Sequence, residues 1–364
     1  MTSASVLLTG ANGYLGQLIA KGILEDSDQS LILWVHARNQ AEGERKEAQL
    51  LERFPNDRHR ISVAWGDLED ETPFESIKPE QVGEVIHGAA VIRFNVESDL
   101  ADLVNLNGTR KVLQFAQRCP KLKLFTQLST VYASGLVAGV IEEAPIREPI
   151  LFANHYERSK CAAEQLLVTE FDELPWKIAR LATIIADDDD GRVSQFNVFH
   201  NTMRLLFHGL ISLVPGLPQT PLYFVTGELA ANGVNSIRTN GGMNKVFHVC
   251  HSIDNAITLK ELIDTCFATF SEFDEFSRKN VLKPLLTDMN SFELLAEGLT
   301  GLSGKIVSEA VSSIRPFAKQ LFFSKDFQVG NFVSAHQSSQ VTDPIKQVQR
   351  TVRYLVGSKW GRQK

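Results

Sequence analysis

The chain carries the sequence SVLLTGANGYLGQLIAKGIL over residues 5–24. Its first four residues form an apolar run that suits a buried strand, and residues 17–24 have the apolar spacing of a helix. A glycine-rich turn, residues 9–16, separates the two segments. The stretch therefore predicts a strand, a tight turn and a helix in direct succession.

The three glycines of this turn have the spacing used to bind dinucleotides. The first glycine permits the tight turn, the second lets the backbone approach a phosphate, and the third allows close packing of the helix on the sheet. The N-terminus of the helix then faces the anion. The expected contacts to a dinucleotide cofactor are Gly10, Asn12, Gly13, Tyr14, Leu15 and Gly16. An ordinary tight turn is the alternative.

The next apolar run, residues 30–35, ends in His36-Ala37-Arg38. An acidic residue about 20 positions after the last glycine normally binds the ribose 2′-hydroxyl of NAD. Here a positive side chain stands instead, and it tolerates the 2′-phosphate that a carboxylate would repel. We therefore expect NADP(H), with Arg38 as the phosphate ligand and His36 beside it. A solvated arginine at the start of a charged helix is the alternative.

Four further apolar runs alternate with helical patterns, at residues 60–68, 85–90, 121–128 and 177–186. This alternation predicts an α/β fold, a doubly wound parallel sheet of the Rossmann type. The run 60–68 ends at Asp67 and Leu68, which are both expected to contact the cofactor, and Asp67 could accept a hydrogen bond from the adenine amino group. The run 85–90 ends in the small residues Ala89 and Ala90, which would let the cofactor lie close to the chain.

The predicted domain organisation follows from where this alternation stops. Residues 1–190, with a returning segment at 222–262, are expected to form the NADP-binding Rossmann domain. Residues 191–221 and 263–364 are expected to form a smaller, mostly helical C-terminal lobe that binds substrate or acts as a lid. The apolar segment 194–213 could line a substrate pocket or pack on the sheet.

Tyr156 and Lys160 are four residues apart, so on a helix they lie on one face. The lysine charge would favour the phenolate and lower the tyrosine pKa from about 10 toward neutrality. Tyr156 would then donate a proton to a carbonyl oxygen that receives a hydride, while Lys160 could also hold the nicotinamide ribose. The alternative is a structural pair, because the same spacing occurs in many helices.

The fifth strand ends in Ser129-Thr130. A hydroxyl at the carboxyl edge of the sheet could hydrogen-bond the substrate carbonyl and stabilise the developing negative charge. Thr130 is the first choice for this role and Ser129 the second. Asn105, on the preceding helix, would support the site and the cofactor, or serve a structural role.

These motifs together resemble the extended short-chain dehydrogenase/reductase family over residues 4–262. The resemblance rests on the glycine turn, on Asn105-Leu106-Asn107-Gly108-Thr109, on Ser129-Thr130 and on Tyr156-x-x-x-Lys160. Within the family, residues 85–95 and 125–130 resemble the thioester reductases and fatty acyl-CoA reductases of the male-sterility type. This resemblance implies an NADPH-dependent enzyme that reduces acyl thioesters, with Thr130, Tyr156 and Lys160 as catalytic residues.

Composition and charge argue against nucleic-acid binding, membrane insertion and metal binding. The formal net charge of −6 argues against a nucleic-acid partner. No early apolar stretch approaches a membrane span of about 20 residues, so a cytoplasmic location is expected. No metal site is expected, because the four cysteines are scattered and the run Asp187–Asp190 is typical of a solvated loop.

The C-terminal tail is basic. Its positive residues are Lys346, Arg350, Arg353, Lys359, Arg362 and Lys364. They form a solvated helix face or a docking site for an acidic carrier protein.

The sequence therefore predicts an NADPH-dependent oxidoreductase that passes a hydride to a carbonyl. An acyl thioester on coenzyme A or on a carrier protein is the leading substrate, and an aldehyde or alcohol is the product. The enzymatic alternatives are a reductase or dehydrogenase of a hydroxy or keto compound, sterol-like or 3-hydroxyacyl, and a sugar-nucleotide epimerase. An NADP-binding sensor or scaffold without turnover is the non-enzymatic alternative.

Overall fold

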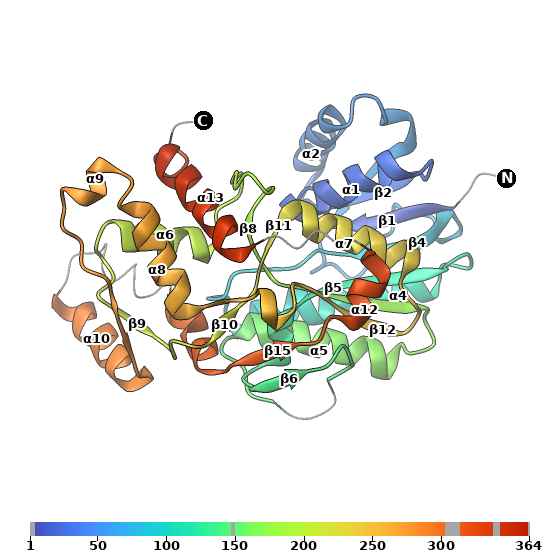
Figure 1. Cartoon of the computed structure of the whole chain (residues 1–364). Coiled ribbons are helices and arrows are strands. Elements are labelled where there is room, and N and C mark those ends of the chain that lie inside the picture. Colours follow the sequence, from blue (N-terminus) through green and yellow to red (C-terminus); the bar gives the residue numbers. More distant parts are fainter. Residues whose placement is uncertain (1–3, 147–149, 303–313, 338–342, 363–364) are drawn as a thin grey trace.

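Seven parallel strands form one central sheet in this computed structural model, which describes residues 4–146, 150–302, 314–337 and 343–362. The strand order is β12-β7-β5-β4-β1-β2-β3 (Figure 1). The strands are β1 (Ser5–Thr9), β2 (Leu31–His36), β3 (Ile61–Gly66), β4 (Val82–His87), β5 (Leu124–Thr130), β7 (Trp176–Leu181) and β12 (Lys245–Val249). The predicted doubly wound parallel sheet is confirmed, and β12 adds the returning segment to its edge.

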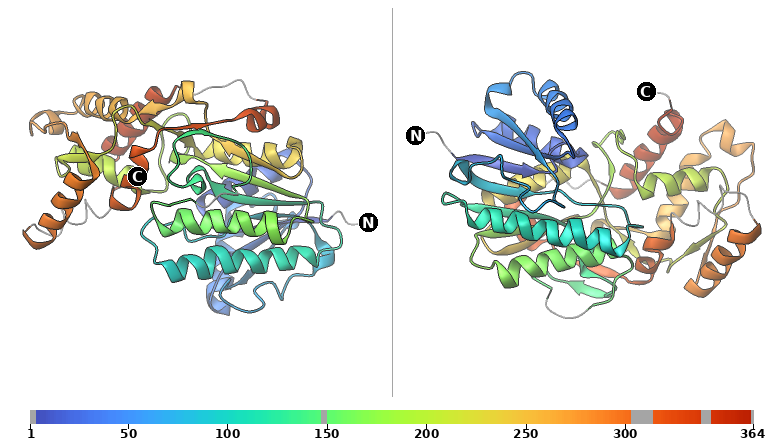
Figure 2. Two further views of the ribbon diagram at one scale, coloured as in Figure 1. Left: turned by 90° about the horizontal axis from the view of Figure 1, so that it is seen from below. Right: turned by 180° about the vertical axis from the view of Figure 1, so that it is seen from behind.

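Helices cover both faces of this sheet because its strands are apolar on both sides. In β1, Val6 and Leu8 pack into one apolar layer and Leu7 into the other. The first layer is covered by α1 (Tyr14–Asp26), α2 (Gln40–Arg53), α7 (Gly227–Asn240) and α12 (Gly330–His336). The second is covered by α4 (Gly108–Gln117) and α5 (His155–Glu170), and the short α3 (Ser98–Ala101) packs against α5. Figure 2 shows α4 and α5 side by side below the sheet.

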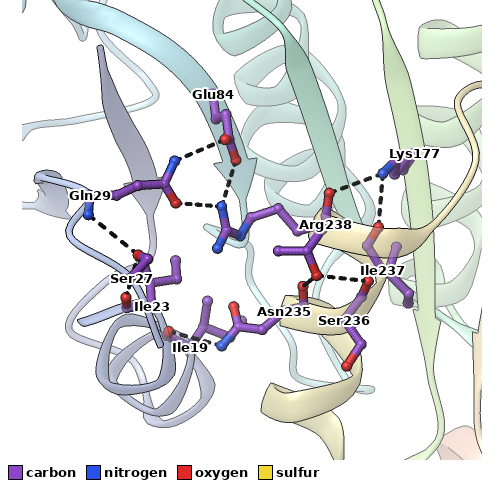
Figure 3. A network of polar contacts seen from close by, with 11 residues as sticks. Ile19, Ile23, Ser27, Gln29, Glu84, Lys177, Asn235, Ser236, Ile237 and Arg238 are labelled. Carbon is purple, nitrogen blue, oxygen red and sulfur yellow. Dashed lines mark hydrogen bonds and ion pairs between the residues drawn. The ribbon is translucent and has the colours of Figure 1, made fainter. Parts of the chain in front are cut away.

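A polar network closes the amino edge of the sheet (Figure 3). The buried Lys177 Nζ donates to the carbonyl oxygens of Ile237, at 2.8 Å, and Arg238, at 3.0 Å, at the C-terminal end of α7. Arg238 Nη1 in turn donates to Glu84 Oε2 at 2.9 Å and to Gln29 Oε1 at 2.7 Å. The network ties α7 to β4 and β7. Structural hydrogen bonds therefore occupy the amino edge, and the opposite, carboxyl edge of the sheet remains for a ligand.

The order of the strands reverses between β1 and β4. In open parallel sheets, ligands bind outside the carboxyl ends of the strands at such a reversal. The glycine turn follows β1, and the small residues 88–90 follow β4. The fold thus brings two predicted cofactor segments to the same crevice.

The C-terminal lobe has its own apolar core. The lobe's helices are α6 (Val198–Phe207), α8 (Leu259–Phe270), α9 (Asp274–Ser277), α10 (Met289–Leu302) and α13 (Pro344–Gly357). The C-terminal helix α13 packs along α8 (Figure 1). Buried Phe207, Phe270 and Phe276 form the aromatic centre of this core.

Within the described ranges, four pairs of short strands lie outside the central sheet. They are β6 (Gly139–Ile141) with β15 (Lys325–Phe327), β8 (Thr183–Ala186) with β11 (Phe224–Thr226), β9 (Leu213–Pro215) with β14 (Leu285–Thr287), and β10 (Pro221–Leu222) with β13 (Ile257–Thr258). Residues 330–336 were expected in the lobe, but α12 lies on the sheet instead. The reason is that Phe332 and Ala335 pack into the same apolar layer as α7.

Candidate active site

The glycine turn has the geometry that its spacing predicts. Gly10 has φ +74°, and a Cβ atom there would lie 2.8 Å from the backbone nitrogen of Ala89. Gly13 is the N-cap of α1, where no side chain caps the helix and no acidic residue occupies the first turn. The first amide groups of α1 are thus left to an anion, which the helix dipole favours. The turn fits the pyrophosphate of a dinucleotide.

A large cleft of about 840 Å³ begins at this turn and runs across the carboxyl edge of the sheet. We call it the main cleft. Thirteen of the predicted site residues line it, namely Gly10, Asn12, Gly13, Tyr14, Leu15, Gly16, His36, Ala89, Ala90, Ser129, Thr130, Tyr156 and Lys160. The predicted catalytic and cofactor residues therefore share one cavity.

Thr130, Tyr156 and Lys160 all line this cleft. Asn154 caps α5 by accepting from the backbone nitrogen of Glu157 at 2.9 Å, which sets the start of the helix and the position of Tyr156 in its first turn. The Tyr156 hydroxyl lies beside the Thr130 side chain. One turn later, Lys160 Nζ donates to the carbonyl oxygen of Leu128 at 2.7 Å.

The prediction that Lys160 lowers the pKa of Tyr156 is wrong for this structure. Burial raises the pKa of the Tyr156 hydroxyl well above its usual value, and the neighbouring charge of Glu157 raises it further. Burial also lowers the pKa of Lys160 to about 8, against the opposing effect of Glu164. Desolvation is thus the largest influence on the pKa of Tyr156, and Lys160 is not among the groups that shift it. A hydroxyl that holds its proton remains able to donate it to a substrate.

The Ser129 hydroxyl is hydrogen-bonded to one member of a buried ion pair and is therefore not free to bind a substrate carbonyl. It donates to Glu164 Oε1. Glu164 also pairs with Arg180 at 2.7 Å, and both of these side chains are buried. Of the two hydroxyls predicted for the substrate carbonyl, only that of Thr130 is placed beside Tyr156.

Asn105 does not line the cleft but braces its wall. Its side chain is buried, accepts from the backbone nitrogen of Val91 at 2.8 Å and donates to the Val91 carbonyl at 3.0 Å. It also donates to Ser159 Oγ at 2.9 Å. Asn105 therefore fixes the loop after β4 against α5, as a support and not as a direct contact.

The predicted adenine-side residues are arranged differently from the expectation. His36 lines the cleft, and its Nε2 lies 3.0 Å from Asp67 Oδ2, so the Asp67 carboxylate is occupied by His36. Leu68 is buried in the apolar layer under the sheet. Arg38 is exposed beside the cleft, and its backbone nitrogen donates to Glu42. Of these four residues, His36 alone contributes to the cleft lining among the described residues.

A second, apolar cavity of about 110 Å³ lies between the sheet and the lobe. We call it the apolar chamber. Its lining includes Val198, Phe199, Thr202, Met203 and Leu206 of α6 and Leu259, Leu262 and Ile263 of α8. The segment 194–213 thus lines an apolar pocket, as predicted, but Phe207 and Ile211 pack in the core of the lobe and not on the central sheet.

The chamber adjoins the main cleft at Tyr156. Phe94, Tyr132, Thr183 and Val198 line both cavities. The Phe94 ring meets the Tyr156 ring edge-on, with 5.6 Å between the ring centres, so the junction lies directly beside Tyr156. A carbonyl group at Tyr156 could therefore have an apolar chain in the chamber.

Some residues of the main cleft were not named as site residues from the sequence. They are Ile92, Arg93, Phe94, Asn95 and Pro316. Residues 92–95 follow shortly after Ala90, so an extension of that segment would have found them. Gln195, Phe196, Asn197, His200 and Asn201 also line the cleft, and they lie in the segment 194–213 that was expected to line a pocket.

The basic C-terminal helix is partly neutralised within the chain. Arg353 pairs with Glu272 at 2.8 Å, Arg350 donates to the carbonyl oxygen of Asp189 at 2.7 Å, and Lys346 lies 3.8 Å from Asp343. Lys364 lies outside the described residues. Docking of an acidic carrier remains a prediction.

Within the described ranges, no helix is long and apolar enough to cross a membrane, and no cluster of three potential metal ligands occurs. All four cysteines are buried and free.

Comparison with known families decides the affiliation. The family model described as male sterility protein, an NAD-binding family, matches residues 8–234. The chain belongs to the male sterility protein family. The predicted membership of the extended short-chain dehydrogenase/reductases, an oxidoreductase family, is thereby confirmed, and the match covers both the glycine turn and the Tyr156–Lys160 pair.

Curated relatives of this male sterility family member align over shorter segments. Fatty acyl-CoA reductase 1 of Gallus gallus is 30% identical over 148 residues, which are 35% of this chain and 28% of the relative. Isonitrile lipopeptide synthase of Streptomyces coeruleorubidus is 28% identical over 216 residues, 56% of this chain and 15% of the relative. The alignments therefore span less than a third of either relative.

Solved structures establish the fold of the family member over its whole length. The terminal R domain of the myxalamid PKS-NRPS pathway superposes with a TM-score of 0.76 at 17% identity, covering 99% of this chain and 92% of that domain. UDP-glucuronic acid 4-epimerase from Bacillus cereus, in complex with NAD, gives a TM-score of 0.66 at 14% identity, covering 98% and 99%. The family and the fold imply a nicotinamide cofactor.

Proposed function

We propose that the chain is an NADPH-dependent reductase of acyl thioesters, bound to coenzyme A or a carrier protein, and that it forms an aldehyde or alcohol. The junction of the apolar chamber with the main cleft at Tyr156 carries this proposal. It allows a thioester carbonyl to reach Tyr156 and Thr130 while its acyl chain is removed from water. The relatives named as fatty acyl-CoA reductases support the same substrate class.

The chamber sets the scale of the acyl chain. A volume of about 110 Å³ has room for roughly seven to eleven groups the size of a water molecule or a methylene. Each buried methylene contributes about 0.8 kcal/mol to binding. An acyl group of medium length would thus obtain several kcal/mol from the chamber, whereas a nucleotide-linked sugar would place polar groups against phenylalanine and leucine side chains.

The residues at the junction have complementary tasks in this reaction. A bound nicotinamide dinucleotide would supply the hydride to the carbonyl carbon. Thr130 would hold the carbonyl oxygen, and Tyr156 would give it a proton as negative charge develops there. Breakage of the carbon–sulfur bond would then release the thiol and leave the aldehyde. Lys160 would hold the ribose and keep a positive charge close to Tyr156.

NADPH is preferred over NADH in this proposal because positive side chains surround the adenine end of the cleft. His36 lines the cleft, Arg38 is exposed next to it, and Lys46 pairs with Glu42 at 2.6 Å. The hydrogen bond from Lys46, which is the largest influence, lowers the pKa of Glu42 to about 2. A ribose 2′-phosphate would therefore meet an acidic side chain, Glu42, that is already paired with Lys46, and the exposed guanidinium group of Arg38.

The test incubates the purified chain with NADPH and a panel of acyl-CoA thioesters of increasing length, ketones and sugar nucleotides. Loss of the reduced-nicotinamide absorbance with acyl-CoA, together with an aldehyde or alcohol product, is the expected result. Oxidation of NADPH with ketones but not with thioesters would show that the substrate is a keto compound. Tight NADPH binding without turnover of any compound would favour a sensor.

A further inference from the structure

A polar cluster interrupts the apolar wall of the chamber. Glu157, Gln320 and Lys325 all line the chamber, and 0%, 6% and 4% of these residues are exposed. Glu157 lies in the first turn of α5, next to Tyr156, whereas Gln320 comes from the turn before β15 and Lys325 is the first residue of β15. Such groups are costly in an apolar wall unless each hydrogen bond is made. Their partners therefore show what the cluster lacks.

The partners of Gln320 fix the orientation of its amide group. Its Nε2 donates to Glu157 Oε2 at 2.8 Å and, more weakly, to the carbonyl oxygen of Gly135 at 3.4 Å. A carboxylate and a carbonyl oxygen only accept hydrogen bonds. A flipped amide would place two acceptors face to face. Gln320 Oε1 is therefore the amide atom that these two hydrogen bonds leave without a partner.

Gln320 Oε1 is buried and has no hydrogen-bond partner among the residues that the structure describes. Lys325 does not supply one, because its Nζ donates to Ser134 Oγ at 3.1 Å and to the Gly135 carbonyl and lies 5.8 Å from the centre of the Tyr132 ring. A buried acceptor without a donor has lost its hydrogen bonds to water and gained none in exchange, which destabilises the site. A ligand that brings a donor recovers this free energy.

The Glu157 carboxylate, by contrast, is fully engaged. Its oxygens accept from the backbone nitrogen of Ala153 at 3.1 Å, from Asn154 Nδ2 at 3.0 Å and from Gln320 Nε2. A donor entering the chamber would thus meet the amide oxygen of Gln320 and not the carboxylate. The cluster offers a neutral acceptor at one place in an otherwise apolar wall.

We propose that the chamber selects an acyl chain that carries a hydrogen-bond donor, a hydroxyl or an amide N–H, and that this donor binds Gln320 Oε1. The inference rests on the proposed function and names its substrate more narrowly. A plain methylene chain leaves the buried acceptor unpaired. Sites built for a hydrogen bond discriminate against analogues that lack it more strongly than apolar sites discriminate by size.

The experiment measures kcat/KM for acyl-CoA thioesters of one length that carry a hydroxyl at successive carbons, a matching series with an amide N–H, and the unsubstituted chain. One position is expected to exceed the unsubstituted chain by about tenfold, a value set by one hydrogen bond. The better series identifies the donor as hydroxyl or amide. Gln320→Met should remove this preference, whereas the control Thr202→Val should keep it, because the Thr202 hydroxyl already donates to the Val198 carbonyl oxygen at 2.8 Å.

Equal kcat/KM values along both series in the wild-type chain would overturn the proposal, with no variant needed. A preference that survives in Gln320→Met would also overturn it. Failure of the proposed function is seen separately, as absence of thioester reduction. In that case the dissociation constants of the corresponding non-reducible thioethers, measured by calorimetry, still test whether a donor-bearing chain binds more tightly than a plain one.

Discussion

The main cleft and the apolar chamber meet at one tyrosine but are built in different ways. The cleft takes much of its lining from short continuous segments, the turn after β1 and the ends of β4 and β5. The chamber takes side chains from segments as far apart as Phe94 and Phe327, and α6 and α8 form much of its wall. We infer that local sequence encodes the chemistry and that tertiary packing encodes the choice of substrate.

Tyr156→Phe tests this division most severely. Loss of the proton donor is expected to lower kcat about 10²- to 10⁴-fold, the range typical of a general acid. Cofactor affinity, measured by fluorescence titration, should stay unchanged because the ring and its contact with Phe94 remain. Chain-length preference should also persist in the residual activity.

Tyr132→Phe is the matched control for Tyr156→Phe. Tyr132 lines both cavities, but its hydroxyl lies beside Thr183 and not beside Thr130 or Tyr156 in the cleft. Its removal should change kcat by no more than a few-fold. Comparable losses in both variants would contradict the assignment of the proton to Tyr156.

Lys325→Met should affect stability more than any other single change in the chamber wall. Burial raises the pKa of Glu157 and lowers that of Lys325, while each charge favours the other. Glu157 and Lys325 form no direct ion pair, but removal of the lysine takes the counter-charge from Glu157. It also leaves the buried acceptors Ser134 Oγ and the Gly135 carbonyl oxygen without this donor, at a cost of about 1–3 kcal/mol. Denaturant unfolding at neutral pH measures the loss.

The loss should depend on pH with a definite sign. A carboxyl group whose pKa is raised in the folded state contributes stability below its unfolded pKa and loses that contribution as pH rises through the folded value. The free energy of unfolding of Lys325→Met should therefore be closer to that of the wild type at acid pH than at neutral pH. The double variant Glu157→Gln with Lys325→Met should recover most of the stability; a double variant as unstable as Lys325→Met would show that packing is responsible.

The sequence was sufficient for the fold and for the chemical centre because both depend on local patterns. Buried parallel strands are visible as apolar runs, and the conformation of Gly10 requires glycine. Tyr156 and Lys160 share a helix, so their spacing alone places them on one face. Thr130 was found for a similar reason, since it ends a strand at the ligand edge.

The chamber could not be predicted in the same way. Gln320 lies in a short 3₁₀ turn, Lys325 begins a strand of three residues, and their meeting with Glu157 depends on the packing of the lobe against α5. The sign of the Tyr156 pKa shift was also missed, because burial is a property of the folded chain. The engagement of Ser129 with Glu164 likewise required the position of α5 on the sheet.

Ile263→Phe asks whether the chamber alone sets chain length. The larger ring would fill part of the space lined by the buried Ile263 of α8. One methylene in an apolar pocket changes specificity about 10- to 200-fold, so kcat/KM for the longest accepted acyl-CoA should fall at least tenfold, while short chains are unaffected. The same substitution at the exposed Ile253 is the control. An equal loss for all chain lengths would mean that the chamber also supports catalysis.

Arg38→Ala should have the smallest effect and should be confined to the cofactor. Arg38 is exposed, and exposed ion pairs are weakened by solvent, so the dissociation constant for NADPH should rise by about three- to tenfold. That for NADH should remain unchanged, because only the 2′-phosphate distinguishes the two. Arg45→Ala, an exposed arginine on α2, controls for the general loss of positive charge. If both cofactors weaken equally, Arg38 does not bind the phosphate, and His36, which lines the cleft, becomes the residue to vary.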